Sequence, residues 1–304
     1  MADLVDMEIF AGVVQSGSMS AAAREMNLSP AVVSKRIQKL EDRLGARLLQ
    51  RTTRQIALTE AGQGYFERVV AILASIEEAE NHVVGGNTSA RGTLKVSAPT
   101  SFGRMHLAPH LAPFLARHPD LKLSIQLTDD FVDIVGDSYD LAIRIAELQD
   151  SSLVARRLAP NTRVICASPQ YLAEYGEPNS LNDLVQHRCL AATTQDVWRL
   201  ESQEGPTQLR VSSIIQTNSS EVIREAVIAG IGIALRSTWD VGDELRAGKL
   251  KVVLPEYRAS RHVAVYAVYP SRRFLPAKVR VLIDFLSDLY GPEPYWDTGV
   301  SLGP

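Results

Sequence analysis

A polar turn followed by a capped amphipathic helix constrains the fold of this chain more than any other feature. Residues 27–29 form the turn, in which Ser29 is a favoured N-cap, and Pro30 suits the first helical position because no N–H partner is needed there. Gly45 is expected to end the helix. Apolar residues between these ends recur at spacings of four, three and four, so this side is expected to face a core. The residues of this stripe are Val33, Ile37, Leu40 and Leu44.

Two shorter helices are predicted before this one. Met7, Phe10 and Val14 form an apolar stripe that predicts a first helix over residues 4–15. A second helix is predicted over residues 20–26, where three consecutive alanines permit close packing. The N-terminal region therefore predicts an all-α unit of three helices, with a short turn between the second helix and the third.

Basic residues are concentrated in the same region. Residues 24–54 contain eight lysines or arginines and three acidic residues, although the whole chain has a formal net charge of −3. Charge alone is equally consistent with a solvated basic face, or with the surface helix of an ordinary three-helix bundle. On the third helix, however, small and polar side chains come first and cations follow, which suits entry into the DNA major groove and contact with phosphates. The residues predicted to contact DNA here are Ser29, Pro30, Ala31, Ser34, Lys35, Arg36 and Gln38.

A short hairpin is predicted directly after the third helix. Residues 48–59 contain two short extended runs on either side of a polar tip, which is typical of a β-hairpin wing. Such wings contact phosphates or the minor groove. The wing residues predicted to contact DNA are Arg51, Thr53 and Arg54.

The order and spacing of these motifs resemble the LysR-type transcriptional regulators over the whole N-terminal domain. The motifs are Ser18-Met19-Ser20-Ala21-Ala22-Ala23, Leu28-Ser29-Pro30-Ala31-Val32-Val33-Ser34-Lys35-Arg36-Ile37, Leu40-Glu41, Leu44-Gly45, Leu48-Leu49, Arg51-Thr52 and Leu58-Thr59-Glu60-Ala61-Gly62. The resemblance implies a winged helix-turn-helix DNA-binding domain at residues 1–60. Family members often carry Gln-Pro where this chain has Pro30-Ala31, so base readout is expected to shift to Ser34, Lys35 and Gln38.

A long helix is predicted over residues 60–84, which no proline interrupts. Its apolar stripe has a short heptad pattern that Glu80 breaks, and alone it is consistent with an ordinary amphipathic helix. The stripe consists of Phe66, Val69, Leu73, Ile76 and Val83. The resemblance implies a linker and dimerisation helix at residues 61–91, with a small and polar hinge at its end.

Strands alternate with helices after the hinge, which predicts an α/β sheet with parallel strands. Strands are predicted at residues 94–97, 121–127, 140–145, 164–167, 209–217, 231–235 and 262–269, and helices at residues 104–117, 221–229 and 276–289.

The resemblance implies that residues 92–290 form a type 2 periplasmic-binding-protein-like, two-lobed α/β sensing domain. Its first lobe is expected at residues 93–162 and 268–290 and its second at residues 168–262, with chain crossings near residues 163–167 and 263–267. Residues 291–304, which contain several glycines and prolines, are expected to form a flexible tail.

Polar residues near the ends of predicted strands are candidates for an effector site. Ligands of α/β sheets bind beyond the carboxyl ends of strands and at helix N-termini, and the resemblance implies a site between the two lobes. The candidates are Thr100, Ser101, Phe102, Thr128, Arg144, Asn218 and Ser219. Taken singly, each is also consistent with an N-cap or turn residue. The polar and cationic side chains favour a small carboxylate as the effector.

Several classes of protein lack their signatures in this sequence. No run approaches the ~20 apolar residues of a membrane span, and the first residues lack the basic start of a secretory signal, so a cytoplasmic protein without membrane contact is expected. Gly230-Ile231-Gly232 is too short for a dinucleotide fingerprint, and the histidines lack a zinc spacing, so no cofactor, metal or catalytic residue is predicted. Cys166 is either a redox-sensing thiol or a buried, inert one.

These features predict a bacterial, sequence-specific DNA-binding regulator that is not an enzyme and responds to a small-molecule effector. Its expected partners are double-stranded promoter DNA, the effector and further copies of the chain, as a dimer or a dimer of dimers. RNA polymerase is a further candidate partner. The alternatives are a small-molecule binding protein and an α/β enzyme, against which the basic N-terminal domain and the missing catalytic constellation argue.

Overall fold

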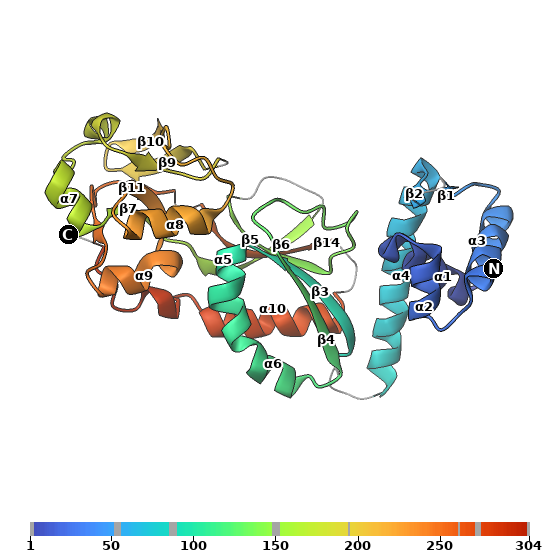
Figure 1. Cartoon of the computed structure of the whole chain (residues 1–304). Coiled ribbons are helices and arrows are strands. Elements are labelled where there is room, and N and C mark those ends of the chain that lie inside the picture. Colours follow the sequence, from blue (N-terminus) through green and yellow to red (C-terminus); the bar gives the residue numbers. More distant parts are fainter. Residues whose placement is uncertain are drawn as a thin grey trace. The chain divides into compact units, whose positions relative to one another are not determined.

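The computed structural model describes residues 3–51, 56–84, 90–147, 153–193, 195–260, 262–270 and 275–302 of the chain. These residues fall into two compact units, an N-terminal unit built chiefly from residues 1–91 and a C-terminal unit built chiefly from later residues (Figure 1). No helix among the described residues is long and apolar enough to cross a membrane.

The N-terminal unit contains the predicted helices and hairpin. Its elements are α1 (Leu4–Ser16), α2 (Met19–Glu25), α3 (Pro30–Leu44), β1 (Leu49–Arg51), β2 (Ile56–Leu58) and α4 (Glu60–Val84). The predicted caps of α3 are confirmed, because Ser29 Oγ accepts a hydrogen bond from Val32 N at 3.3 Å and Gly45 is left-handed with φ of 65°. The expectation that Leu44 faces the core is wrong, since its side chain is 41% exposed. Leu44 is the last residue of α3, where the helix extends past the core.

The core of the N-terminal unit unites α4 with the three preceding helices. Phe66 and Val69 of α4 are buried among Phe10, Ile37 and other apolar residues of this unit, and Leu73 packs partly against the same cluster. At least these three residues of the stripe therefore pack in the core of their own chain, whereas the stripe was expected to form a dimer contact. Ile72, in contrast, is 41% exposed, and the side chain of Val83 lies outside the described residues.

The first lobe of the C-terminal unit is built on a mixed sheet. The described strands have the order β4 (Leu121–Leu127), β3 (Gly92–Ala98), β5 (Leu141–Ala146), β14 (Ala264–Pro270) and β6 (Leu153–Pro160). β3 is parallel to β4 and β5, whereas β14 is antiparallel to β5 and β6, so the expectation of parallel strands holds for only part of the sheet. The helix α10 (Ala277–Tyr290) packs on this lobe through Phe285, whose ring lies 5.2 Å from that of Phe114 between centroids.

The helix predicted at residues 104–117 begins earlier and is not regular. Helical turns run from Thr100 as α5 (Thr100–Phe102), a π-helical turn (Gly103–Leu107), a 3-10 turn (Ala108–His110) and α6 (Leu111–Arg117). Pro109 has no N–H to donate, which disfavours a continuous α-helix at this point.

The second lobe contains a separate sheet. Its described strands have the order β10 (Gly205–Arg210), β9 (Val197–Ser202), β13 (Arg258–Ala259), β7 (Arg163–Ala167), β11 (Ile233–Ser237) and β8 (Cys189–Leu190), and β12 (Lys251–Val252) also pairs with β7. The helices are α7 (Pro169–Tyr175), α8 (Ser220–Ile228), α9 (Thr238–Arg246) and a 3-10 helix (Leu181–Gln186). The strand predicted at residues 209–217 ends at Arg210 in the structure. Beyond it, the Ser213 hydroxyl forms hydrogen bonds with the backbone of Ile215.

The chain crosses between the lobes at two places that differ from the predicted ones. β6 ends at Pro160 and β7 begins at Arg163, so the first crossing is the Asn161-Thr162 segment. β14 pairs with first-lobe strands from Ala264 onward, so the second crossing precedes that residue. Strand pairing therefore assigns residues 163–167 to the second lobe and residues 264–267 to the first.

The expectation of a flexible tail is wrong for residues 291–302. Trp296 is 3% exposed, and its carbonyl oxygen accepts a hydrogen bond of 3.0 Å from Arg246 Nη1. The Trp296 ring packs against the Phe102 ring at 5.8 Å and the His106 ring at 4.7 Å between centroids. Burial of this aromatic side chain offsets the entropy lost when the tail is ordered.

Candidate functional site

The side of α3 opposite its apolar stripe is open to solvent. Ser29, Pro30, Ala31, Lys35 and Gln38 are all exposed, whereas the apolar stripe from Val33 to Leu40 is buried. Ser34 is half-buried between the two sides. The arrangement leaves small, amide and cationic groups on one helical face, which is what contact with base edges and phosphates requires.

Arg36 differs from the other candidates on α3 because it is bound within the N-terminal unit. Its Nη1 lies 3.0 Å from Oδ1 of Asp6 and 3.3 Å from Oδ2 of Asp3. Asp6 is fully buried, and Arg43 Nη1 approaches its other oxygen at 3.5 Å. The hydrogen bond to Asp6 raises the pKa of Arg36. In this structure Arg36 holds α3 against α1.

The hairpin is fixed to α3 by a buried carboxylate. Glu41 is 3% exposed, and its Oε1 accepts hydrogen bonds from Leu48 N at 2.8 Å and Leu49 N at 3.1 Å. Its Oε2 pairs with Arg47 Nη1 at 3.2 Å. The predicted wing contacts cannot be placed in the same way, because the Arg51 side chain, Thr53 and Arg54 lie outside the described residues.

A cavity of about 750 Å³ lies within the C-terminal unit and is lined by residues of both lobes. Three of the predicted effector residues, Ser101, Thr128 and Arg144, line it. The other four do not. Thr100 N donates to Asp129 Oδ1 at 2.8 Å. Phe102 is fully buried among aromatic rings, Asn218 is exposed, and Ser219 is the N-cap of α8.

Asp129 accepts hydrogen bonds from backbone donors at the N-termini of α5 and α8. Its Oδ1 accepts from Thr100 N at 2.8 Å in the first lobe, and its Oδ2 accepts from Ser220 N at 3.3 Å in the second. A second link between the lobes is the ion pair of Arg104 Nη2 with Glu221 Oε1 at 2.6 Å. Both contacts hold the two lobes together at one edge of the cavity.

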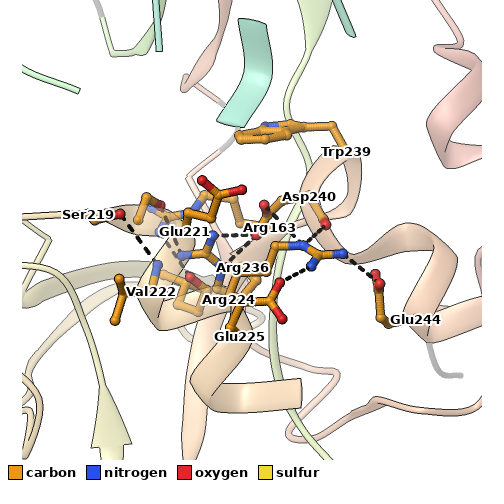
Figure 2. Close-up of polar contacts among 12 residues, drawn as sticks. Arg163, Ser219, Glu221, Val222, Arg224, Glu225, Arg236, Trp239, Asp240 and Glu244 are labelled. Atoms are coloured by element: carbon orange, nitrogen blue, oxygen red, sulfur yellow. Dashed lines mark hydrogen bonds and ion pairs between the residues drawn. The ribbon is translucent and has the colours of Figure 1, made fainter. Parts of the chain in front are cut away.

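Among the described residues, four arginines line the cavity, and they differ in their partners. Arg236 is 4% exposed; its Nε donates to Asp240 Oδ2 at 2.7 Å and its Nη1 to Ser220 Oγ at 3.1 Å (Figure 2). Arg224 joins the same network from outside the cavity, donating to the Asp240 backbone oxygen at 2.9 Å and to Glu244 at 2.6 Å. The charge of Arg236 is therefore compensated by a carboxylate behind the cavity wall.

Among the described residues, neither Arg163 nor Arg144 has such a carboxylate partner. Arg163 Nη2 donates to the Leu235 carbonyl at 3.1 Å, and in the described part of the chain no carboxylate lies within 4.0 Å of it. Burial, together with the charge of Arg236, lowers the pKa of Arg163 to about 10. Arg144 Nη2 donates to the Val132 carbonyl at 2.6 Å, and burial lowers its pKa as well. The fourth, Arg199, is exposed.

Sequence reasoning missed Arg163, Arg236 and the nearby Trp239 and Asn161, all of which line the cavity. A signal was present, because Arg163 and Arg236 each lie in a short and largely apolar strand, where an arginine is unusual; Arg236 is buried there and Arg163 is half-buried. The pairing of those two strands could not be read from the spacing of either one.

The two cysteines lie in apolar surroundings. Cys166 is fully buried and Cys189 is 5% exposed. Burial raises the pKa of Cys166 to about 12 and that of Cys189 to about 11. Since the thiolate is the reactive form, these values favour the inert interpretation of Cys166 over the redox-sensing one.

Comparisons with known proteins agree over nearly the whole chain. The family model of the LysR substrate binding domain matches residues 87–290, and that of the bacterial regulatory helix-turn-helix protein, lysR family, matches residues 4–63. The HTH-type transcriptional activator TtdR of Escherichia coli strain K12 is 37% identical over 93% of this chain and 92% of its own length. The solved structure of CrgA, a LysR-type transcriptional regulator from Neisseria meningitidis, is 33% identical, has a TM-score of 0.61 and covers 95% of this chain and 99% of its own.

Proposed function

This chain belongs to the LysR-type transcriptional regulators, and we propose that the ligand that controls it is a small carboxylate bound in the cavity of about 750 Å³. Regulators of this family combine a helix-turn-helix with an effector-binding domain. The proposal concerns the finer questions of which ligand binds and which residues contact it.

The observation that carries the proposal is the guanidinium of Arg163. It lines the cavity and has no carboxylate partner among the described residues, although burial penalises its charge. A partly desolvated cation is stabilised when an anion pairs with it. A carboxylate in the cavity supplies that partner, and Arg144 supplies a second cation on the first-lobe wall.

On the DNA side, we propose that residues on the solvent side of α3 and at its N-cap contact base edges and phosphates. These residues are Ser29, Pro30, Ala31, Ser34, Lys35 and Gln38, joined by Arg51, Thr53 and Arg54 of the wing. Arg36 is proposed to act by positioning α3, because its guanidinium pairs with Asp3 and Asp6.

Assembly and location follow as further parts of the proposal. The chain works in the cytoplasm as a dimer or a dimer of dimers, acts on promoter DNA, and contacts RNA polymerase there. It catalyses no reaction. The exposed side of α4, which includes Ile72, is the proposed contact between copies, because the opposite side is used in the core of its own unit.

The test is a gel shift and footprint of the full-length protein on the DNA directly upstream of its own gene, with and without a panel of small carboxylates. We expect a protected region longer than one dimer site, whose length changes with at least one acid. Matched amines and neutral amides of the same carbon skeleton are the controls. A footprint that responds to an amine and to no acid contradicts the carboxylate proposal.

A further inference from the structure

Three cavity-lining residues are next in sequence to Thr162 or Thr238, which are joined by hydrogen bonds. Thr238 N donates to the Thr162 carbonyl at 2.9 Å, and Thr238 Oγ1 also donates to it at 3.2 Å. Asn161 and Arg163 flank Thr162 in the first crossing, and Trp239 follows Thr238 at the start of α9. All three flanking residues line the cavity, so this bond brings them to one place.

Several buried polar atoms of this group lack a hydrogen-bond partner among the described residues. Both amide atoms of Asn161 and Nε1 of Trp239 are unpaired, and these residues are only 7% and 8% exposed. Ser101, 2% exposed, has an unpaired Oγ and lines the same cavity from the first lobe. It is held near Trp239 by its neighbour Phe102, whose ring meets the indole edge-on at 5.3 Å between centroids. We name Ser101, Asn161, Arg163 and Trp239 the hinge cluster.

The hinge cluster sits beside a network in which nearly every charge is paired. Figure 2 shows Arg163 and Trp239 next to Arg236, Asp240, Arg224 and Glu244, whose contacts with one another are drawn as dashed lines. Asp240 already accepts from Arg236 and lies 3.7 Å from Arg224. Its Oδ2 is bonded by Arg236, whereas its Oδ1 accepts no hydrogen bond among the described residues. The hinge cluster also has polar atoms without a partner among these residues, and a ligand that bonds them gains free energy, because unsatisfied buried polar groups are costly.

The chemistry of the unpaired groups defines the ligand they match. Arg163 and the Trp239 indole only donate hydrogen bonds, so they suit the oxygens of a carboxylate. The Asn161 amide and the Ser101 hydroxyl both donate and accept, so they suit a hydroxyl group, which does the same. Three exposed acids, Asp129, Asp130 and Glu147, also line the cavity and disfavour an anion near them, which leaves the buried end for the carboxylate.

We propose that the effector is a small hydroxy acid, whose carboxylate pairs with Arg163 and whose hydroxyl is recognised by Asn161 and Ser101. The inference rests on the proposed carboxylate cavity and adds to it the hydroxyl group and the residues that recognise it. A site built to bond a hydroxyl rejects the analogue that lacks it, because its own polar groups are then left unpaired.

The test uses matched acids that differ in one hydroxyl group. Lactate is compared with propionate, and malate with succinate. Both stereoisomers of each hydroxy acid are used. Binding to the full-length protein is measured by calorimetric titration at constant ionic strength. In at least one pair we expect the hydroxy acid to bind at least about tenfold more tightly than its partner. Asn161→Leu should reduce that preference to within about twofold while leaving the binding of the deoxy acid nearly unchanged.

Two arginine variants separate the anion contact from general charge. Arg163→Gln should weaken both members of each pair by about tenfold or more, and Arg163→Lys should restore part of the loss. Arg210→Gln is the matched control, because Arg210 is an exposed second-lobe arginine, paired with Asp196, that does not line the cavity. Melting temperatures of all variants are measured, and if Arg163→Gln does not fold, the Lys variant and Asn161→Leu carry the test.

Each failure has a separate meaning. Equal affinity for the hydroxy and deoxy member of every pair overturns the hydroxyl inference and leaves the carboxylate proposal standing. Undiminished acid binding by Arg163→Gln and Arg163→Lys shows that the carboxylate lies elsewhere, which also overturns the inference. Absence of binding by every acid contradicts both the inference and the carboxylate proposal.

Discussion

In the described part of the N-terminal unit, two buried carboxylates, Asp6 and Glu41, find their partners within the same unit. Asp6 pairs with Arg36 and Arg43, and Glu41 bonds the backbone that leads into the hairpin. In the C-terminal unit, Oδ2 of Asp240 is bonded by Arg236, but among the described residues Arg163 has no carboxylate partner and several polar atoms around it, Asp240 Oδ1 included, have no hydrogen-bond partner. Among the described residues, the buried side-chain atoms without a hydrogen-bond partner are concentrated in the C-terminal unit, several of them at its cavity, and Tyr65 OH is the one in the N-terminal unit.

This difference fits the two tasks of a ligand-controlled regulator. A DNA-reading surface must keep one geometry, so its buried charges are fixed internally. A sensing cavity must gain free energy when its ligand arrives, and unpaired donors provide that gain because the ligand satisfies them. The links at Asp129 and between Arg104 and Glu221 hold the lobes without filling those donors.

The largest effect is expected where a buried charge in the C-terminal unit loses its partner. Asp240→Ala leaves the guanidinium of Arg236 without a counter-charge, and we expect the free energy of unfolding to fall by about 3–5 kcal/mol. Urea unfolding followed by intrinsic fluorescence measures the loss. Asp196→Ala, which breaks an exposed pair with Arg210, should cost about 1 kcal/mol or less. Equal losses would show that the buried network stabilises the C-terminal unit no more than a surface pair does.

A second prediction concerns α4, whose two sides are given different roles. Phe66→Ala should lower the stability of the N-terminal unit by about 3 kcal/mol, because Phe66 is buried in its core. Ile72→Asp should leave that stability within about 1 kcal/mol, since Ile72 is exposed, but should shift the oligomer towards monomers. Thermal unfolding and analytical ultracentrifugation separate the two effects. An unchanged oligomer in Ile72→Asp would move the contact between copies away from this side.

A smaller effect is expected on the DNA-reading surface. Lys35→Ala should weaken binding to the footprinted DNA by about tenfold, without a change in melting temperature, because Lys35 is exposed on α3. Lys122→Ala removes an exposed lysine from β4 and should leave binding unchanged. Fluorescence anisotropy at several salt concentrations measures both. If the two variants bind alike, the reading surface does not include this part of α3.

The smallest effect is expected at the cysteines. Their pKa values of about 12 and about 11 lie well above pH 8, so the thiolate is scarce there and burial restricts access as well. Iodoacetamide at pH 8 should modify neither Cys166 nor Cys189 in the native protein, and both in 6 M urea, as measured by mass spectrometry. Rapid modification of native Cys166 would revive the redox-sensing alternative.

The sequence by itself determined the N-terminal unit almost residue by residue. Caps and apolar spacing act within a few residues, so Ser29, Pro30 and Gly45 define α3 wherever the helix is placed. The same local signals located the strands β4, β5 and β7 and the helix α10 to within a few residues. They could not distinguish which side of α4 faces its own core, because an apolar stripe is the same in a core and in a dimer seam.

Tertiary structure decided the cavity, the crossings and the tail. Thr162 and Thr238, or Phe102 and Trp296, are far apart in the sequence, and only strand pairing and the folded core bring them together. Thr100 and Ser219 have the right local chemistry for a ligand, yet their groups are engaged by Asp129 and by the cap of α8. Whether a polar group can bind a ligand depends on all the neighbours that the fold places around it. Those neighbours come from distant parts of the chain, so the spacing of residues along the sequence does not reveal them.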